Sequence, residues 1–269
     1  MNTFETVINK YNSLRFNSIA ESLEMLVSQA EDNETSYLQF ADMLVSHELS
    51  KRDKNRFNLN MKRAGFPVKK QIEEFDFVSQ TTITKKQINR LLDFSYIDNR
   101  ENIVFIGPPG VGKTHLAIGI SYKSVHAGYK VLFTTALELI EMLDLAETKG
   151  ELKKKINTIS KFDTLVIDEL GYLPMNKQSM FNFFQLINAL YEYRSIIITT
   201  NKDFTNWGDF FFDDNVAVPI VDRIIHSFTY FYDGWRKLSA QTKNQFKLSA
   251  GGGSVLLSGS GSKLLSIDT

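Results

Sequence analysis

A glycine-rich segment that contains a lysine and a threonine, GPPGVGKT at 107–114, has the clearest chemistry in the sequence. It matches the phosphate-binding pattern G-x4-G-K-[ST] and lies between an apolar run, NIVFI, and a helical segment, as a P-loop requires. Its glycines let successive backbone N–H groups point inward at a helix N-terminus, which makes a concave anion site. We therefore predict that ATP binds through Gly107, Pro108, Pro109, Gly110, Val111, Gly112, Lys113, Thr114 and His115.

Two side chains of this loop and an acidic pair further along the chain have separate predicted roles. Lys113 should reach the β- and γ-phosphates, and Thr114 should offer its hydroxyl to Mg2+. The apolar run DTLVIDEL ends in Asp168 and Glu169. We expect Asp168 to hold Mg2+ through water and Glu169 to polarise the attacking water as general base. Taken alone, the acidic pair has an alternative interpretation as a solvated turn.

A third apolar run, SIIITTNKD, ends in Thr199, Thr200 and Asn201. A polar side chain at this position could contact both the γ-phosphate and the attacking water. The alternative is ordinary strand-end turn chemistry, for which Asn is a common choice. The order of the motifs along the chain predicts that this strand inserts between the two strands that carry the P-loop and the acidic pair.

The elements that position these residues begin with a helical region. No glycine or proline occurs before Gly65, and apolar residues recur at helical spacing. Thr35 or Ser36 is expected to cap the last helix, and Gly65 and Pro67 to close it. We predict a small all-helical domain over residues 1–66 that binds DNA or a partner.

Beyond this region, β-rich runs alternate with helical segments. The runs expected as strands are 102–106, 130–135, 163–168 and 195–200, and the segments expected as helices are 113–127, 137–160 and 177–193. A fifth strand is expected at 228–232 because FTYFY has high β-propensity. Such alternation indicates βαβ units and a parallel sheet covered on both faces. We predict a three-layer α/β/α P-loop domain over residues 67–250.

Composition excludes several classes of protein. The chain of 269 residues is 43% hydrophobic, and its 31 basic residues balance 31 acidic ones, so net charge identifies no partner. The absence of cysteine excludes a disulfide scaffold, a thiolate metal site and a cysteine nucleophile. The N-terminus lacks the apolar core of a signal peptide, and no apolar run approaches the roughly 18 residues of a membrane span. We expect a soluble cytoplasmic protein with no membrane partner.

The C-terminal residues 251–269 are rich in Gly and Ser, which is typical of a flexible linker. This stretch is either a natural tail or linker sequence added by cloning, and we leave it out of the predicted fold.

Several segments together resemble a known family, the IstB-like helper ATPases of insertion sequences, which belong to the AAA+ superfamily beside the DnaC-type helicase loaders. The segments that carry the resemblance are GPPGVGKTHLA (107–117), LVIDELGYLP (165–174), IIITTN (196–201) and VDRIIH (221–226). The resemblance extends upstream through FPVKKQIEEFDF and covers most of residues 1–226. It implies an AAA+ ATPase domain preceded by helices.

The resemblance also implies roles for individual residues. Asn201 matches the sensor 1 residue that reports on the γ-phosphate, and Arg223 matches the arginine finger that acts on ATP bound by the neighbouring subunit. A guanidinium there would stabilise charge on the transferred phosphoryl group. The alternative for Arg223 is a surface salt bridge with Asp222 or Asp214.

Two further parts of the match are less specific. The segment from Phe75 to Phe77 resembles the linker that packs beside the adenine, although these phenylalanines are equally compatible with a core role, which we prefer for at least one of them. After His226 the resemblance weakens, and Arg236, the only arginine after Arg223, is not assigned as a sensor 2 residue.

A basic segment gives a candidate DNA-binding surface. Residues 51–70 contain eight basic residues and one acidic residue. Basic side chains on one helix neutralise phosphates and release counterions, which drives sequence-independent binding, although a charge run is usually only a solvated face. The residues expected to contact DNA are Lys51, Arg52, Lys54, Arg56, Lys62 and Arg63. A smaller patch, KGELKKK at 149–155 with Lys161, ranks second.

Together the motifs and the resemblance predict an Mg-dependent ATPase that oligomerises on duplex DNA and helps a cognate transposase use its target. Lys113, Glu169, Asn201 and Arg223 are its expected catalytic residues, and Thr114 and Asp168 its Mg2+ ligands. The first alternative is a helicase loader that uses the same ATP site. The second is a nucleotide-gated DNA-binding scaffold with little turnover.

Overall fold

The structure, a computed structural model, describes residues 3–78, 83–171, 175–203, 207, 214–226, 228–232, 247–250 and 253–256. The chain forms two compact units, residues 1–59 and 60–269.

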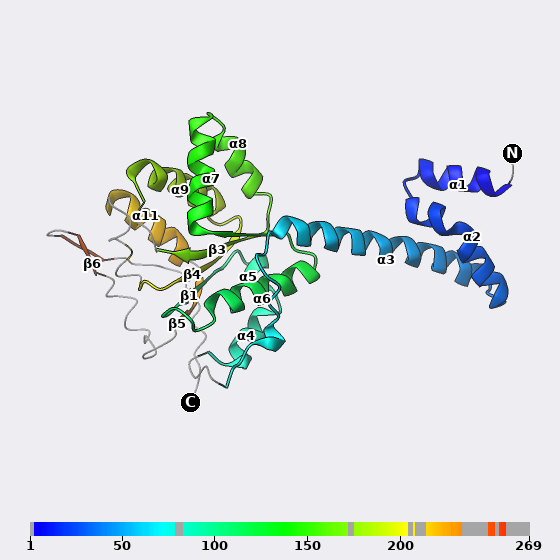
Figure 1. Ribbon diagram of the computed structural model, residues 1–269, viewed down its shortest axis with the longest axis horizontal. Coiled ribbons are helices and arrows are strands. Elements are labelled where there is room, and N and C mark those ends of the chain that lie inside the picture. The colour runs from blue at the N-terminus through cyan, green and yellow to red at the C-terminus, as the bar shows by residue number, and fades with distance from the viewer. Residues whose placement is uncertain are drawn as a thin grey trace. The chain divides into compact units, whose positions relative to one another are not determined.

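The N-terminal unit consists of helices, as predicted: α1 (Thr3–Ser13), α2 (Asn17–Asp32) and α3 (Tyr37–Ala64), whose last residues belong to the second unit (Figure 1). Ser36 caps α3, because its hydroxyl accepts the Gln39 N–H at 3.4 Å while the Gln39 side chain accepts the Ser36 N–H at 3.0 Å. The helix ends before Gly65, which adopts the left-handed φ of 69° typical of a helix end. The core is built from Ile19, Leu23, Leu26 and Leu44.

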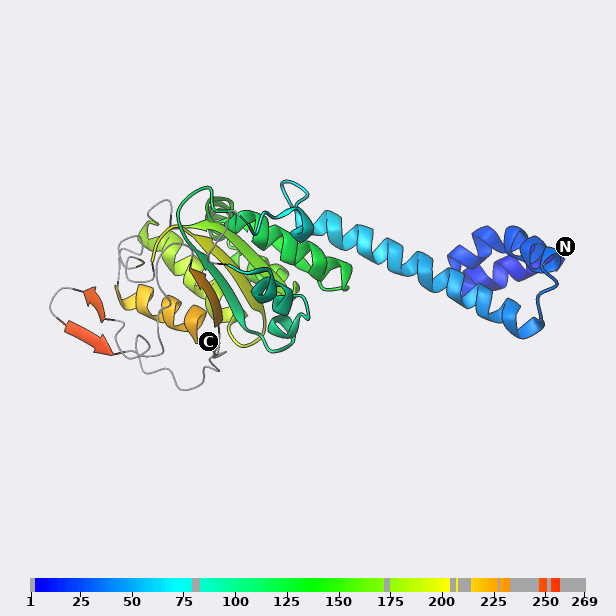
Figure 2. The same ribbon diagram turned by 90° about the horizontal axis from the view of Figure 1, so that it is seen from below.

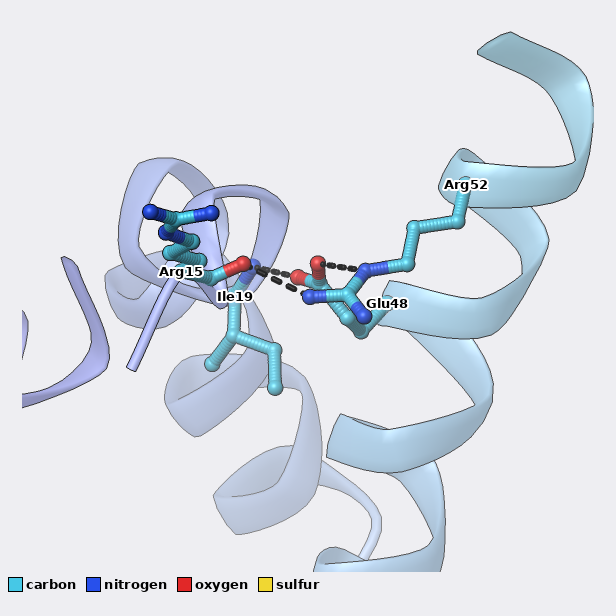
Figure 3. Close-up of polar contacts among 4 residues, drawn as sticks. All are labelled: Arg15, Ile19, Glu48 and Arg52. Carbon is cyan, nitrogen blue, oxygen red and sulfur yellow. Dashed lines mark hydrogen bonds and ion pairs between the residues drawn. The ribbon is translucent and has the colours of Figure 1, made fainter. Parts of the chain in front are cut away.

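A buried carboxylate joins the helices of this unit (Figure 3). Glu48 on α3 accepts the N–H of Ile19 at 3.0 Å, in the first turn of α2, where the N-cap residue Phe16 provides no side-chain cap. The other oxygen of Glu48 pairs with Arg52 Nε at 2.8 Å. Arg52 also donates to the carbonyl oxygen of Arg15 at 2.6 Å and lies over the Phe16 ring. A side chain of α3 therefore caps α2, and Arg52 fixes the corner between α1 and α2.

The second unit is built on a five-stranded parallel sheet of order β2-β3-β4-β1-β5. The strands are β1 (Asn102–Ile106), β2 (Val131–Thr135), β3 (Thr164–Leu170), β4 (Ser195–Thr200) and β5 (Phe228–Tyr232). Strand β4 lies between β3 and β1, which confirms the predicted insertion between the strands that carry the acidic pair and the P-loop. All of these strands agree with the predicted runs to within two residues.

Helices cover both faces of the sheet, which confirms the predicted three layers (Figures 1 and 2). One face carries the elements η1 (Ile72–Glu74), α4 (Lys85–Leu91), α5 (Ser95–Asp98) and α6 (Lys113–His126), and the other carries α7 (Ala136–Thr148), α8 (Leu152–Ile159), α9 (Lys177–Leu190) and α11 (Asp214–Ile225). Side chains alternate across the pleat, so Val104 and Ile106 of β1 join the core beneath α7, α8, α9 and α11. The strands are buried on both faces, which explains their continuous apolar sequences.

Two parts of the chain differ from the sequence-based expectation. The helix expected over 137–160 is two helices, because Gly150 between them adopts a φ of 67° that a continuing helix cannot contain. Residues 247–250 and 253–256 form an antiparallel pair, β6 and β7, so part of the stretch expected as a flexible linker is a strand. The rest of that stretch lies outside the described residues. None of the helices in the described ranges is long and apolar enough to cross a membrane.

Candidate nucleotide-binding site

The P-loop leaves the carboxyl end of β1 and leads directly into α6. Gly110 and Gly112 adopt φ values of 86° and 88°, in the left-handed region that favours glycine. A side chain at position 112 would also clash with a neighbour, because a Cβ there would lie 2.5 Å from Cε2 of Phe75. The loop therefore needs glycine at position 112 both for its backbone conformation and for the close approach of an aromatic ring.

The Lys113 ammonium group lies against the loop. Its Nζ donates to the carbonyl oxygens of Gly107 at 2.9 Å and Pro108 at 2.8 Å. These bonds hold a positive charge at the N-terminus of α6, where backbone N–H groups and the helix dipole already favour an anion.

Thr114, Asp168 and Thr199 form one hydrogen-bonded cluster across three elements. The Thr114 hydroxyl donates to Asp168 Oδ1 at 2.8 Å, and the Thr199 hydroxyl donates to the same oxygen at 2.5 Å. The Thr199 oxygen also accepts the backbone N–H of Glu169 at 2.9 Å. The Asp168 side chain is buried at the end of β3. Thr199 thus fixes both residues of the acidic pair from the neighbouring strand.

Glu169 lies in an irregular part of β3. The register between β3 and β4 shifts between Ile167 and Leu170, so one extra residue is accommodated in β3. Glu169 has a φ of 62°, which is unusual for a residue other than glycine, and its side chain is exposed while its neighbours on both sides are buried. This conformation turns the carboxylate away from the core at the carboxyl edge of the sheet. Backbone strain of this kind is concentrated at functional sites.

Asn201 follows β4 at the same edge of the sheet. Its Oδ1 atom is buried and forms no hydrogen bond with the part of the chain that the structure describes. A buried polar atom without a partner is costly, and it is expected where a ligand completes the site. The predicted site residues of β1, β3 and β4 are therefore gathered at one edge, because parallel strands end on the same side.

The linker before the sheet packs on α6. Phe75 is buried against Gly112, and its ring meets the rings of His115 and Phe77 edge-on at 5.3 Å and 4.7 Å. His115 also contacts the backbone oxygen of Gln71 at 2.8 Å through Nε2. Phe75 thus has the buried position expected of a core residue and also shapes the P-loop, while Phe77 is half-buried.

An ion pair holds the same linker further along α6. Glu73 contacts Lys123, and hydrogen bonding to that ammonium group lowers the pKa of the Glu73 carboxyl. At Gly119 an added Cβ would lie 2.6 Å from Cδ1 of Ile72, so the linker lies directly on the helix. The segment from Gln71 to Phe77 is thereby tied to the helix that carries the P-loop.

Arg223 lies at the opposite edge of the sheet, near the end of α11. Asn102, the first residue of β1, donates from Nδ2 to the carbonyl oxygen of Ile224 at 2.9 Å and accepts the N–H of Ile196, at the start of β4, at 2.9 Å. The guanidinium of Arg223 donates from Nε to Asn188 Oδ1 and from Nη1 to the carbonyl oxygen of Pro219, each at 3.0 Å. The structure therefore does not bring Arg223 together with the P-loop of its own subunit.

The predicted DNA-contacting residues are all exposed on α3, but they differ in their contacts. The Arg52 guanidinium forms an ion pair with Glu48 and a hydrogen bond with the backbone oxygen of Arg15. Arg56 forms an exposed ion pair with Asp53 at 3.0 Å. The other exposed cations predicted for this surface are Lys51 and Lys54 in the first unit and Lys62 and Arg63 in the second.

The residues at the carboxyl edge fit a magnesium–nucleotide complex. The described residues contain no group of three or more acidic or histidine side chains that could hold a metal ion by themselves. Mg2+ commonly binds through one or two protein oxygens with phosphate and water completing its shell, which is the number that Thr114 and Asp168 offer. The glycine conformations, the Lys113 position and the buried Asn201 oxygen agree with such a ligand.

This fold and site define a P-loop protein with an α/β fold of the AAA+ type. AMPPCP-bound DnaA from Aquifex aeolicus is structurally similar, with a TM-score of 0.50 and 21% sequence identity over 62% of this chain and 50% of that chain. The family model described as IstB-like ATP binding protein matches residues 9–232. The chain belongs to this family, which is found in IS21-type insertion sequences.

Curated relatives agree with this assignment. The chain is 35% identical over 257 residues to the IS21 ATP-binding protein of Pseudomonas aeruginosa, covering 93% of this chain and 96% of the relative. It is 38% identical over 208 residues to the IS5376 ATP-binding protein of Geobacillus stearothermophilus, covering 77% and 83%. The chain is therefore an insertion-sequence ATP-binding protein of the IstB type.

Sequence reasoning missed several residues that organise these sites. Thr199 was recognisable only as a polar strand end, and its two bonds to the acidic pair depend on the pairing of β3 with β4. Glu48 gave no signal, because a glutamate in a polar helix resembles any solvated residue. The contacts of Asn188 with Arg223 depend on how α9 packs against α11.

Proposed function

We propose that this protein is an ATPase that binds ATP and Mg2+ at the P-loop, oligomerises on duplex DNA and delivers a transposase to its target. The observation that carries the proposal is the carboxyl-edge cluster, in which Thr114, Asp168, Thr199 and Glu169 are joined by hydrogen bonds beside Lys113. Family membership supports ATP binding and the link to a transposase. The geometry of the site supports hydrolysis, and the charge of α3 supports DNA binding.

The proposed reaction is hydrolysis of ATP to ADP and phosphate. Backbone N–H groups of the loop and the Lys113 ammonium would bind the β- and γ-phosphates, and Thr114 with Asp168 would hold Mg2+, which neutralises phosphate charge when bound. Glu169 would accept a proton from the attacking water, since its carboxylate is exposed at this edge. Asn201 would position that water or the γ-phosphate.

Arg223 is proposed to act on the nucleotide of a neighbouring subunit. The five residues of β1 separate the two sheet edges by about 16 Å at roughly 3.3 Å per residue, which is longer than an arginine side chain. Arg223 therefore cannot serve its own P-loop. A heterologous contact between copies would place it at the next subunit's phosphates and would link hydrolysis to assembly.

The basic surface of α3 supports the DNA-binding part of the proposal. Lys51, Lys54, Lys62 and Arg63 are exposed, so they can neutralise phosphates without sequence preference. Arg52 contributes less to this surface than predicted, because its guanidinium is used within the N-terminal unit.

Duplex binding measured by fluorescence anisotropy at fixed salt, with particle mass recorded in parallel, tests the proposal. ATP with Mg2+ should produce large protein–DNA assemblies, and ADP should not. Lys62→Glu and Arg63→Glu should each weaken binding and lower the slope of log affinity against log salt by about 1 or more. Lys10→Glu, an exposed lysine on α1, is the matched control and should leave the slope unchanged. DNA binding that is absent or indifferent to nucleotide, with ATPase activity retained, would favour a helicase loader instead.

A further inference from the structure

Arg223 lies in a cradle that α9 provides. The guanidinium lies 5.2 Å from the ring centroid of Phe184 and 5.7 Å from that of Tyr191, distances at which a cation is attracted to an aromatic face. Asn188 accepts the Nε–H at 3.0 Å. Phe184, Asn188 and Tyr191 are spaced by four and three residues, so they lie on one side of α9 and its end.

The cradle leaves part of the guanidinium available. Arginine has five N–H donors, and the contacts with Asn188 and the carbonyl oxygen of Pro219 use two of them. Within the described part of the protein the other three have no hydrogen-bond acceptor. Arg223 and Tyr191 also line a cavity of about 220 Å³, so the arginine side chain borders open space. The side chain is thus fixed on one side and able to bind an anion on the other.

Such fixation has an energetic consequence. A free arginine side chain must give up rotamer entropy when it is ordered at a phosphate. When its own subunit already orders the guanidinium, the arginine loses less rotamer entropy on binding. Its N–H donors are also held in a fixed geometry. The contacts are intramolecular and do not depend on the neighbouring subunit.

We propose that Phe184, Asn188 and Tyr191 are positioning residues that preorganise Arg223 for the nucleotide of the adjacent subunit. This inference rests on the proposed function, in which Arg223 acts between subunits. The helix that forms the cradle, α9, is the next described helix after β3, the strand that carries Asp168 and Glu169.

A double-mutant cycle on the assembled, DNA-bound full-length protein tests the inference. Asn188 is exposed on a helix, so Asn188→Ala should leave the fold intact. We expect it to lower kcat for ATP about tenfold while KM changes less than about twofold, because positioning affects the transition state more than ground-state binding. Arg223→Ala should lower kcat by about 1,000-fold. Adding Asn188→Ala to Arg223→Ala should have no further effect, because Asn188 acts only through the guanidinium.

Two controls separate the possible failures. Asn188→Asp keeps an acceptor for Nε–H and should recover most of the lost kcat, whereas Lys177→Ala, at an exposed position of the same helix, should behave like the parent protein. If Arg223→Ala has no effect, the assignment of Arg223 in the proposed function is wrong. If Arg223→Ala is inactive but Asn188→Ala matches the parent, or if the two effects multiply in the double variant, the positioning role is wrong.

Discussion

Removing the Glu48 carboxylate should unfold the N-terminal unit locally without disturbing the nucleotide site. The Glu48 side chain is 7% exposed, caps α2 through the Ile19 N–H and pairs with Arg52, whose side chain is 49% exposed. A hydrogen bond to a charged group contributes about 1.5–3 kcal/mol. The half-exposed ion pair adds at most about 1 kcal/mol after solvent screening. Glu48→Ala should therefore cost about 2–4 kcal/mol.

Hydrogen exchange of the full-length protein, read by mass spectrometry on peptides from residues 3–50, measures this effect. A loss of about 2–4 kcal/mol corresponds to a rise of about 30-fold to 700-fold in the local opening constant, since about 1.4 kcal/mol is a factor of ten. Glu48→Gln keeps an acceptor for Ile19 but loses the charge, so its exchange should lie between those of the parent and Glu48→Ala. Peptides from the sheet of the second unit serve as an internal reference and should not change.

Glu24→Ala, at an exposed glutamate of α2, is the matched control and should exchange like the parent. The reasoning is refuted if Glu48→Ala and Glu24→Ala give the same exchange in the α2 peptides. It is equally refuted if Glu48→Gln is as destabilised as Glu48→Ala, because the capping bond would then contribute nothing.

Three further changes test other parts of the structure. Gly112→Ala should weaken ATP binding by at least about tenfold in calorimetry, because the left-handed backbone and the Phe75 ring exclude a Cβ. An unchanged affinity for ATP would contradict the described loop conformation. Thr199→Val should lower kcat for ATP by about 10-fold to 100-fold in a steady-state assay, because Asp168 loses a hydrogen bond; an unaltered kcat would refute that role. Burial raises the pKa of Tyr96 far above its ordinary value of 10.0, so the unfolded chain releases this proton first and stability should fall as the pH rises above about 10. Tyr96→Phe should cost about 1 kcal/mol at neutral pH and make stability less dependent on pH above 10 in denaturant titrations; equal alkaline slopes would refute this.

The strands of the sheet could be predicted because local sequence determines them. Strand β1 was expected at 102–106 and occupies those residues, since a strand buried on both faces requires a continuous apolar run. The order of the motifs along the chain also predicted that β4 lies between β3 and β1. The division of the helix expected at 137–160 was signalled by Gly150, but periodicity on both sides concealed it.

The contacts that orient functional groups could not be predicted, because they join residues far apart in the chain. Glu169 is turned outward by a register shift between two strands, which no local pattern encodes. Charge identified Arg52 as a candidate and the family resemblance identified Arg223, but sequence reasoning could not show that Arg52 is used within its own unit. It also could not show that Asn188, on another helix, holds Arg223 in place.

Complementation between inactive subunits tests the central claim, an ATP site shared by neighbours, most directly. Lys113→Ala removes phosphate binding and keeps Arg223, while Arg223→Ala does the reverse, so each variant alone should hydrolyse little ATP on DNA. In an equal mixture, up to about a quarter of the interfaces should combine an intact P-loop with an intact arginine, and ATP hydrolysis should return at these interfaces. A mixture as inactive as its components, with assemblies of unchanged size, would contradict the account.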